Sequence, residues 1–198
     1  PERCDIWRNA HDELIMQSLD TSVIENIKIV NAKYFHEKSG SSIELNYKIY
    51  GNGILKIKQT LYPSGAENPE LPRFGMKVSV NETFDNLEWF GRGPHESYWD
   101  RKTSAKIDRY KGKVIDQTYK YVRPQETGNK TDIRWLALYN GSIGLMVKGL
   151  PVFDGSVHHY DYALLDYYKG SQRHGKIDII KGNQIDLIID YKQMGVGG

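Results

Sequence analysis

The sequence predicts an all-β fold made of antiparallel strands. Short segments alternate apolar and polar residues with a period of two, and turn signals separate these segments at regular intervals. No strand–helix–strand rhythm appears, which disfavours a parallel sheet. The pattern gives about a dozen short strands with at most one or two short helices, as in a β-sandwich. No repeat of about 20–50 residues is present, which disfavours a propeller or a solenoid.

The first third of the chain is predicted to be a meander. Residues 1–21 are expected to be irregular. Alternating segments follow, at residues 22–35, 42–50 and 54–63. A turn at Gly51-Asn52-Gly53 joins the last two as a hairpin. The polar stretch 64–72 is too short for a linker, so residues 22–198 are predicted to form a single domain.

The rest of the chain continues in the same style. Further strands are predicted at residues 73–80, 87–91, 105–110, 113–119, 132–139, 143–149, 176–180 and 184–191. Residues 150–161 are expected to be looser, and residues 162–168 are the best helical segment, at about two turns. Gly128-Asn129 and Gly141-Ser142 predict tight turns between strands.

Composition excludes several classes of protein. A net charge of +2 with 26% charged residues gives no global field that would attract nucleic acid. The single cysteine, Cys4, excludes an internal disulfide framework. Apolar runs are too short for a membrane span, and the first residues lack the apolar region of a signal peptide. The 14 Tyr and four Trp suit both β-sheets and sugar-binding surfaces.

Residues 87–105 concentrate the most unusual chemistry of the chain. Gly91, Gly93 and Pro94 predict a tight, irregular turn, because glycine tolerates positive φ and proline fixes its own φ. This turn presents two acids, two bases and two aromatic rings within seven residues. They are His95, Glu96, Tyr98, Trp99, Asp100 and Arg101. Such a loop fits a sugar site, a domain interface or an anchored structural corner.

Carboxylates and arginines in the polar loops allow two interpretations. Glycoside hydrolysis needs two carboxylates across one cleft, and the candidates are Glu96, Asp100 and Glu126. A carboxylate flanked by arginines more often forms a structural ion pair, since the guanidinium fork binds carboxylates in fixed geometry. The arginines concerned are Arg92, Arg101, Arg123 and Arg134. A pair between Glu126 and Arg134 is expected across the hairpin at Gly128.

Other chemistries find little support. The adjacent His158 and His159 cannot face the same way in an extended strand, and no third ligand has a telling spacing, so no metal site is predicted. The segment GRGPHE lacks the pattern of a phosphate-binding loop. No Gly-x-Ser-x-Gly elbow occurs, and Cys4 has no organised partner that would activate it.

Three segments carry a specific resemblance. The stretches WFGRGPHESYWDRKTSA (89–105), YVRPQETGNKTDIRWLAL (121–138) and DYKQMGVGG (190–198) closely resemble, in order and spacing, signature blocks of the C-terminal small-chain domain of family 2 lacZ-type β-galactosidases. The segment LPRFGMKVSV (71–80) is similar to the strand before the first block. The N-terminal WRNAHDE departs from the family's WRAPTDND, so that only Trp7, Arg8 and Asp12 carry over.

The resemblance implies a fold, and it assigns catalysis to another domain of the family's enzymes. The family's domain is an antiparallel supersandwich related to galactose mutarotase, and this chain is expected to be a version truncated at its C-terminus. The catalytic glutamates and the magnesium ligands of the family lie on a TIM barrel, so no catalytic residue, cofactor or metal is expected in this fragment. The family's substrate-contacting tryptophan follows the GVGG block, and it is therefore expected to be missing.

The implied function is that of a non-catalytic domain of an enzyme that hydrolyses terminal β-galactosides. Its expected roles are to wall the sugar cleft and to pack against the barrel, and the fragment alone is expected to be inactive. Oligomer contacts, and a cytoplasmic or periplasmic location in a bacterial-type enzyme, stay open. A carbohydrate-binding module and an aldose epimerase are the alternatives. The residues expected to contact sugar or a neighbouring domain are His95, Glu96, Tyr98, Trp99, Arg101, Arg123, Gln125, Glu126, Arg134 and Trp135.

Overall fold

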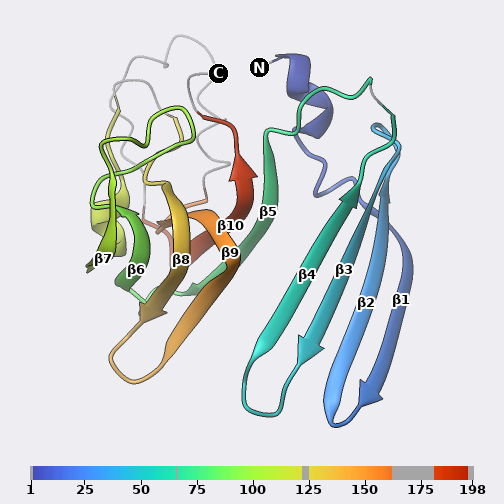
Figure 1. Cartoon of the computed structure of the whole chain (residues 1–198), viewed down its shortest axis with the longest axis horizontal. Helices are drawn as coiled ribbons and strands as arrows, with labels where there is room; N and C mark the ends of the chain where they lie inside the picture. Colours follow the sequence, from blue (N-terminus) through green and yellow to red (C-terminus); the bar gives the residue numbers. More distant parts are fainter. Residues whose placement is uncertain (1, 66, 122–124, 162–180, 196–198) are drawn as a thin grey trace. The chain divides into compact units, whose positions relative to one another are not determined.

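The structure is a computed structural model that describes residues 2–65, 67–121, 125–161 and 181–195. It divides into two compact units, unit 1 (Pro1–Pro72) and unit 2 (Arg73–Gly198). Each unit contains one antiparallel sheet, of four strands and of six strands, which confirms the all-β prediction (Figure 1). The helix at 162–168 and the strand at 176–180 lie outside the described residues, and the single domain over 22–198 stays a prediction.

Unit 1 is a four-stranded meander and not the predicted three-stranded one. Its strands follow one another in the order β1 (Ile15–Ile24), β2 (Ile27–His36), β3 (Ser41–Ile49) and β4 (Leu55–Tyr62). The predicted irregular segment 1–21 therefore contains most of β1. Glu25 and Asn26 have positive φ values of 49° and 65°, and they divide the predicted strand 22–35 with a two-residue turn.

The start of unit 1 is fixed to the end of its sheet. The 3₁₀ helix η1 (Glu2–Trp7) places the indole of Trp7 against the ring of His36, with centroids 5.8 Å apart. The Trp7 indole nitrogen donates to the carbonyl oxygen of Pro69 at 3.1 Å. His36 is buried and bonds to the hydroxyl of Ser39 at 2.8 Å. These contacts attach η1, at the start of unit 1, to His36 of β2 and to Pro69 near the end of unit 1.

Unit 2 is a six-stranded sheet in the order β5-β10-β9-β8-β6-β7. Its strands are β5 (Arg73–Asn81), β6 (Asn86–Gly93), β7 (Lys106–Lys113), β8 (Lys130–Tyr139), β9 (Gly144–His158) and β10 (Gln184–Gln193). The last strand of the chain thus lies between β5 and β9, and it pairs with residues more than 100 positions earlier (Figure 1). This pairing brings the third block of resemblance beside the first two.

Three predictions about unit 2 are wrong. β7 is one strand where two were expected, and the 3₁₀ helix η2 (Val114–Gln117) follows it. β9 continues to His158 through the predicted loose segment, because its second half pairs with both β8 and β10. The glycines at 91 and 93 lie within β6 and not in a turn. Added Cβ atoms there would come within 2.9 Å of the Ile133 Cα and 2.7 Å of the Tyr110 ring.

The hydrophobic core lies on one face of the six-stranded sheet. Alternate residues of the strands supply it, and Val114 of η2 packs against the same cluster. The core residues are Leu87, Trp89, Val114, Ile133, Leu136, Leu138, Phe153, Val157, Ile185 and Leu187. The opposite face of the sheet, called here the polar face, carries Asp154 and His158 of β9 across from Asp190 and Asp186 of β10. The candidate site described next lies on this face.

Candidate functional site

The three blocks of resemblance meet at the polar face of unit 2. We use the term loop junction for the residues that meet there: residues 94–105, residues 125–129 and the end of the chain from Asp190 to Gly195. Hydrogen bonds join the first segment to the second and the second to the third. A Cβ at Gly195 would overlap the carboxylate of Asp100, so the third segment also touches the first.

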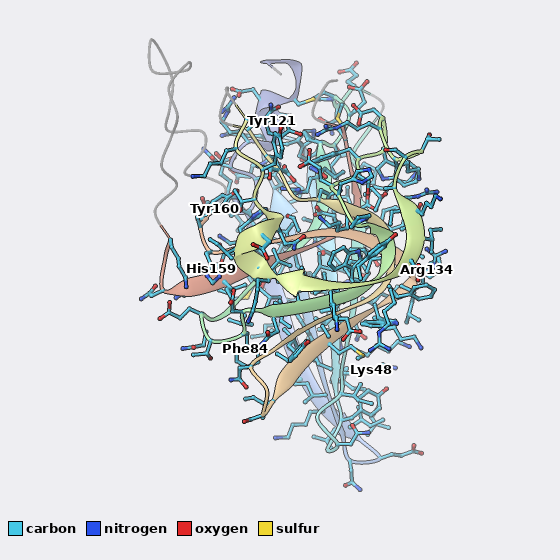
Figure 2. The ribbon with its side chains drawn as sticks, turned by 90° about the vertical axis from the view of Figure 1, so that its left-hand side faces the viewer. Lys48, Phe84, Tyr121, Arg134, His159 and Tyr160 are labelled. Atoms are coloured by element: carbon cyan, nitrogen blue, oxygen red, sulfur yellow. The ribbon has the colours of Figure 1, made fainter. Side chains whose placement is uncertain are left out.

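Glu96 ties the first segment to the second. Its carboxylate accepts hydrogen bonds from the Gly128 backbone N–H at 2.8 Å, from the Arg101 guanidinium at 2.7 Å and from the Tyr121 hydroxyl. The Glu96 side chain is 12% exposed, whereas that of Arg101 is 47% exposed. Tyr121 is labelled in Figure 2. Glu96 is therefore a well-partnered anion that holds two loops together.

Ser97 and Asn129 continue this attachment. The Ser97 backbone N–H donates to the carbonyl oxygen of Asn129 at 2.8 Å, and the Asn129 amide donates to the carbonyl oxygen of Ser97 at 2.8 Å. The Ser97 hydroxyl accepts from the Thr131 backbone N–H at 3.0 Å. All three residues are buried. The first segment thus packs onto the start of β8 as a fixed corner.

Glu126 ties the second segment to the third. Its Oε1 atom accepts from Arg73 Nη2 and from the Gln193 amide, each at 2.6 Å. Arg73 also donates from Nε to Asp190 Oδ2 at 2.9 Å. Arg134 instead donates to the carbonyl oxygen of Asp132 at 2.6 Å. The predicted pair between Glu126 and Arg134 is therefore wrong, because Arg73, 53 residues before Glu126, takes that place.

Trp99 is a partly exposed aromatic ring of the loop junction, at 41% exposure. Its indole nitrogen donates to Asp154 Oδ2 at 2.6 Å, and Asp154 Oδ1 accepts from the Asp132 backbone N–H at 3.3 Å. The ammonium groups of Lys102 and Lys192 lie 3.7 and 4.5 Å from the centroid of the ring. The ring is therefore held in one orientation while much of it stays in contact with solvent.

Ionisable groups are buried beneath these loops. Burial raises the pKa of Asp190 to about 7 and that of Asp154 to about 6, although Arg73 opposes the first shift and the Trp99 hydrogen bond opposes the second. Burial also lowers the pKa of Lys130 to about 8 and that of His158 to about 3. Buried charges are costly, so at neutral pH His158 is neutral.

The remaining predicted residues differ in exposure and surroundings. Tyr98 is 1% exposed, and burial raises the pKa of its hydroxyl. His95 is exposed and bonds to the Ser104 hydroxyl at 3.0 Å. Trp135 lies on β8 opposite Phe90 of β6, under the guanidinium of Arg109, whose central carbon is 5.8 Å from the ring.

Two further predicted residues, Arg123 and Gln125, come shortly before Glu126 in the sequence. Gln125 is half-buried beside Glu126, whereas Arg123 lies outside the described residues. Arg134 projects from β8 and is labelled in Figure 2, with its guanidinium carbon 5.7 Å from the Phe90 ring. The structure therefore places seven of the predicted residues in the loop junction and Arg134 and Trp135 further along the sheet. The seven are His95, Glu96, Tyr98, Trp99, Arg101, Gln125 and Glu126.

Sequence reasoning missed four residues that belong to the loop junction or bond to it. Asp190 and Gln193 belong to the third block of resemblance. The sequence identified this block but did not predict that Asp190 binds Arg73 or that Gln193 binds Glu126. Arg73 begins a strand, and Asp154 lies in a segment predicted to be loose. No local signal distinguishes these two, because their partners, Glu126 and Trp99, are 53 and 55 residues away.

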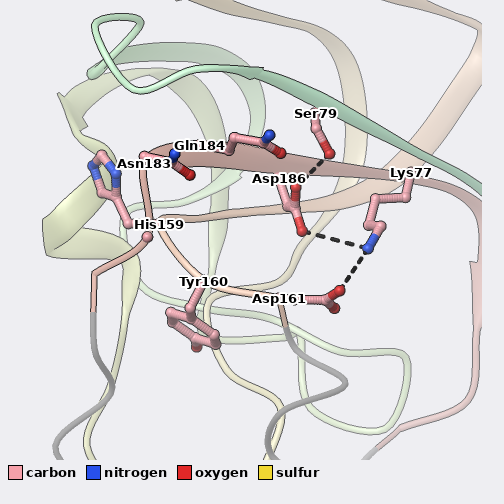
Figure 3. Close-up of a pocket in the computed structure, with 9 residues that line it drawn as sticks. Lys77, Ser79, His159, Tyr160, Asp161, Asn183, Gln184 and Asp186 are labelled. Atoms are coloured by element: carbon pink, nitrogen blue, oxygen red, sulfur yellow. Dashed lines mark hydrogen bonds and ion pairs between the residues drawn. The ribbon is translucent and has the colours of Figure 1, made fainter.

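A shallow pocket of about 280 Å³ lies at the other end of β5 and β10. There Lys77 contacts Asp161 at 2.9 Å and Asp186 at 3.5 Å, and the Ser79 hydroxyl donates to Asp186 at 2.6 Å (Figure 3). The His159 ring points away from this group and bonds to Asp85 at 3.0 Å. These polar groups have protein partners, which suits a structural role.

Among the residues that the structure describes, no group of three or more His, Cys, Asp or Glu side chains has the arrangement of a metal site. In the same part of the chain, no helix has the length and apolar character needed to cross a membrane.

Comparison with known proteins gives the family. The family model described as "Beta galactosidase small chain" matches residues 1–198. A β-galactosidase of Priestia megaterium is 38% identical over the whole chain, and one of Vibrio cholerae is 30% identical over 94% of it. A β-galactosidase of Staphylococcus xylosus is 27% identical over 98% of the chain. The chain spans 17–19% of the length of these relatives, so further domains or chains accompany the matched region in them. The match over its full length shows that this chain belongs to the β-galactosidase small-chain family.

Proposed function

We propose that this chain is a non-catalytic domain of a β-galactosidase-like glycoside hydrolase, in which it walls one side of the cleft for β-galactosides and packs against other domains. The observation that carries this proposal is Trp99. Its indole N–H is held by Asp154, and the ring is 41% exposed where the three blocks meet. Sugar-binding sites use such oriented aromatic faces together with a few polar groups.

The state of the loop carboxylates supports the non-catalytic part of the proposal. A glycosidase needs two carboxylates that are free to act as acid, base or nucleophile on a substrate. Glu96 instead accepts from Gly128, Arg101 and Tyr121, and Glu126 accepts from Arg73 and Gln193. We therefore assign the hydrolytic carboxylates, and any magnesium, to other domains of the enzyme.

The two alternatives have weaker support. A free-standing sugar-binding module would combine Tyr98, Trp99 and Trp135, but Tyr98 is 1% exposed and Trp135 packs under Arg109. An epimerase needs a histidine base beside a glutamate. His158 is buried, with a pKa lowered to about 3, so it is a poor base near neutral pH, and its ring centroid lies 4.8 Å from that of Tyr160.

The test is made in the full-length enzyme that carries this chain. Trp99→Ala is expected to raise KM for a nitrophenyl β-galactoside about tenfold, equivalent to about 1.4 kcal/mol of binding free energy. It should also lower Tm, because the buried Asp154 loses its indole donor. Trp99→Phe keeps an aromatic face and should restore most of the affinity. Trp135→Ala is the control and should leave KM unchanged.

Two results would contradict the proposal. If Trp99→Ala leaves KM at the wild-type value, the ring does not line the cleft. If residues 1–198 alone hydrolyse the nitrophenyl galactoside above the buffer rate, the chain is catalytic. Saturable quenching of tryptophan fluorescence by galactose, in residues 1–198 alone, would favour the binding-module alternative.

A further inference from the structure

The chain contains two Asn-Gly dipeptides, and both lie in hairpin turns. Asn52-Gly53 lies between β3 and β4 in unit 1, and Asn140-Gly141 lies between β8 and β9 in unit 2 (Figure 1). All four residues are exposed, so the atoms of their own unit leave them open to water. Asparagine deamidates most readily before glycine, because glycine has no side chain to keep its backbone nitrogen away from the asparagine side-chain carbon. The sequence makes the two sites equivalent, whereas the structure distinguishes them.

The nucleophile of deamidation is the backbone nitrogen of the glycine, which attacks after it has lost its proton. The Gly53 N–H donates to the carbonyl oxygen of Tyr50 at 3.1 Å. The Gly141 N–H has no acceptor among the described residues. A hydrogen bond stabilises the protonated form of the amide, and it has to break before the nitrogen can attack. The structure therefore restrains the nucleophile at Gly53 and leaves the one at Gly141 available.

The electrophile is the side-chain carbonyl of the asparagine. Asn140 Oδ1 accepts hydrogen bonds from the backbone N–H of Ser142 at 3.2 Å and from that of Ile143 at 3.3 Å. These bonds fold the side chain back over its own turn, as in an Asx turn, and so keep Cγ near the Gly141 nitrogen. They also stabilise the negative charge that Oδ1 acquires during the attack, as backbone N–H groups do in an oxyanion hole.

The turn at Asn52 supplies less of this support. Asn52 Oδ1 accepts from one backbone N–H, that of Ile54, at 3.1 Å. Crowding does not separate the two sites, because a Cβ added at Gly53 or at Gly141 would meet no atom within 4 Å. The difference between the turns therefore lies in their hydrogen bonds, which favour reaction at Asn140 in both the nucleophile and the electrophile.

We propose that Asn140 is a modification site of this chain, at which the folded turn promotes spontaneous deamidation. The Gly141 nitrogen bonds to Asn140 Cγ, the Cγ–Nδ2 bond breaks, and Nδ2 leaves as ammonia with the proton that the Gly141 nitrogen has lost. Water then opens the resulting succinimide to aspartate or isoaspartate, and no oxidant or reductant is needed. The net charge of +2 falls by one. In isoaspartate, the main chain of the β8–β9 turn is one carbon longer.

Peptide mass spectrometry tests this inference without reading activity, so its outcome is independent of the proposed function. The protein that carries this chain is incubated at mildly alkaline pH, once folded and once unfolded in urea. In the folded sample, Asn140 should convert at least about tenfold faster than Asn52, because its oxyanion has two donors and its nucleophile is unbonded. In urea the two rates should be similar, because the turns are lost.

A matched pair of variants assigns the product to its site. Asn140→Gln keeps an amide but would have to close a six-membered ring, so the more acidic species that forms in the folded protein should disappear from ion-exchange chromatography. Asn52→Gln should leave this species unchanged.

Four outcomes would overturn the inference. Equal rates in the folded protein, or a faster reaction at Asn52, would show that the hydrogen bonds at Asn140 do not promote the reaction. The same excess of Asn140 over Asn52 in urea would assign it to the local sequence and not to the fold. Conversion of Asn140 in urea but not in the folded protein would show that the turn protects this residue. Loss of the acidic species in Asn52→Gln would assign it to the other turn.

Discussion

The carboxylate of Glu96 accepts a hydrogen bond from the backbone N–H of Gly128 at 2.8 Å, across 32 residues of sequence. This bond joins the loop after β6 to the segment before β8. Arg101 and Tyr121 bind the same carboxylate from the solvent side. Residues 94–105, which contain candidate residues of a sugar site, are therefore held in place as a structural corner. Within this loop, the Trp99 ring is partly exposed to solvent.

Removal of the Glu96 carboxylate should destabilise unit 2. Glu96→Ala is expected to lower the free energy of unfolding by about 1–3 kcal/mol, because the buried Gly128 N–H loses its acceptor. Urea denaturation measures the change. Glu96→Gln keeps an acceptor oxygen and should lose less. Equal stability of Glu96→Ala and the wild type would return this loop to the candidates for ligand binding.

Arg101→Ala should cost less than Glu96→Ala. The Arg101 side chain is 47% exposed, so solvent screens its pair with Glu96, and exposed pairs contribute about 0–1 kcal/mol. The carboxylate also keeps Gly128 and Tyr121 as donors. The same urea experiment checks this order, and a larger loss for Arg101→Ala would contradict it.

Gly128→Ala should be strongly destabilising. Gly128 has a φ of 78°, and a Cβ there would overlap the carbonyl oxygen of Gln117 and lie 3.1 Å from His158 Cε1. The expected loss of Tm corresponds to at least about 2–3 kcal/mol. Gly141→Ala is the matched control, because its φ is 96° and its surroundings are open, so it should cost about 1 kcal/mol. Similar Tm losses for the two variants would argue against close packing at Gly128.

The emission of Trp99 should change with pH. Asp154 accepts from the indole N–H, and burial raises the pKa of Asp154 to about 6. Ionisation of Asp154 places a negative charge on this bond, so tryptophan fluorescence should titrate with a midpoint near pH 6. Asp154→Asn and Trp99→Phe should each abolish this transition. Persistence of the transition in Asp154→Asn would assign it to another group.

Asp190 should contribute a fall in the stability of unit 2 as pH rises from about 4 to 7. Asp154, whose pKa is also raised, adds to this fall, and His158, whose pKa is lowered, opposes it. The pKa of Asp190 is raised by burial to about 7, so in this range the folded state holds a proton that the unfolded chain has lost. The loss should reach up to about 4 kcal/mol and level off above pH 7. Asp190→Asn should flatten this dependence in a series of urea denaturations. The exposed Asp108→Asn is the control and should keep the wild-type slope.

Strand periodicity was enough to predict the all-β fold and most of the strands. Alternation of apolar and polar residues located β3, β4, β5 and β10 closely, because each has one apolar side and one polar side. The turn at Glu25-Asn26 was missed because neither residue is glycine, although both adopt positive φ. β9 was cut short because long-range pairing with β10 extends it past Pro151.

The sequence by itself also determined the family and the three blocks that form the loop junction. Tertiary structure decided which side chains meet there. Arg73 binds Glu126, and Asp154 binds Trp99. Local sequence patterns cannot predict such pairs, because the partners are more than 50 residues apart. The role of Gly91 is another such case: its sequence context indicated a turn, but the close approach of Ile133 from β8 explains the missing side chain. These contacts arise where strands that are distant in the chain pack together, and that packing requires the whole sheet to form.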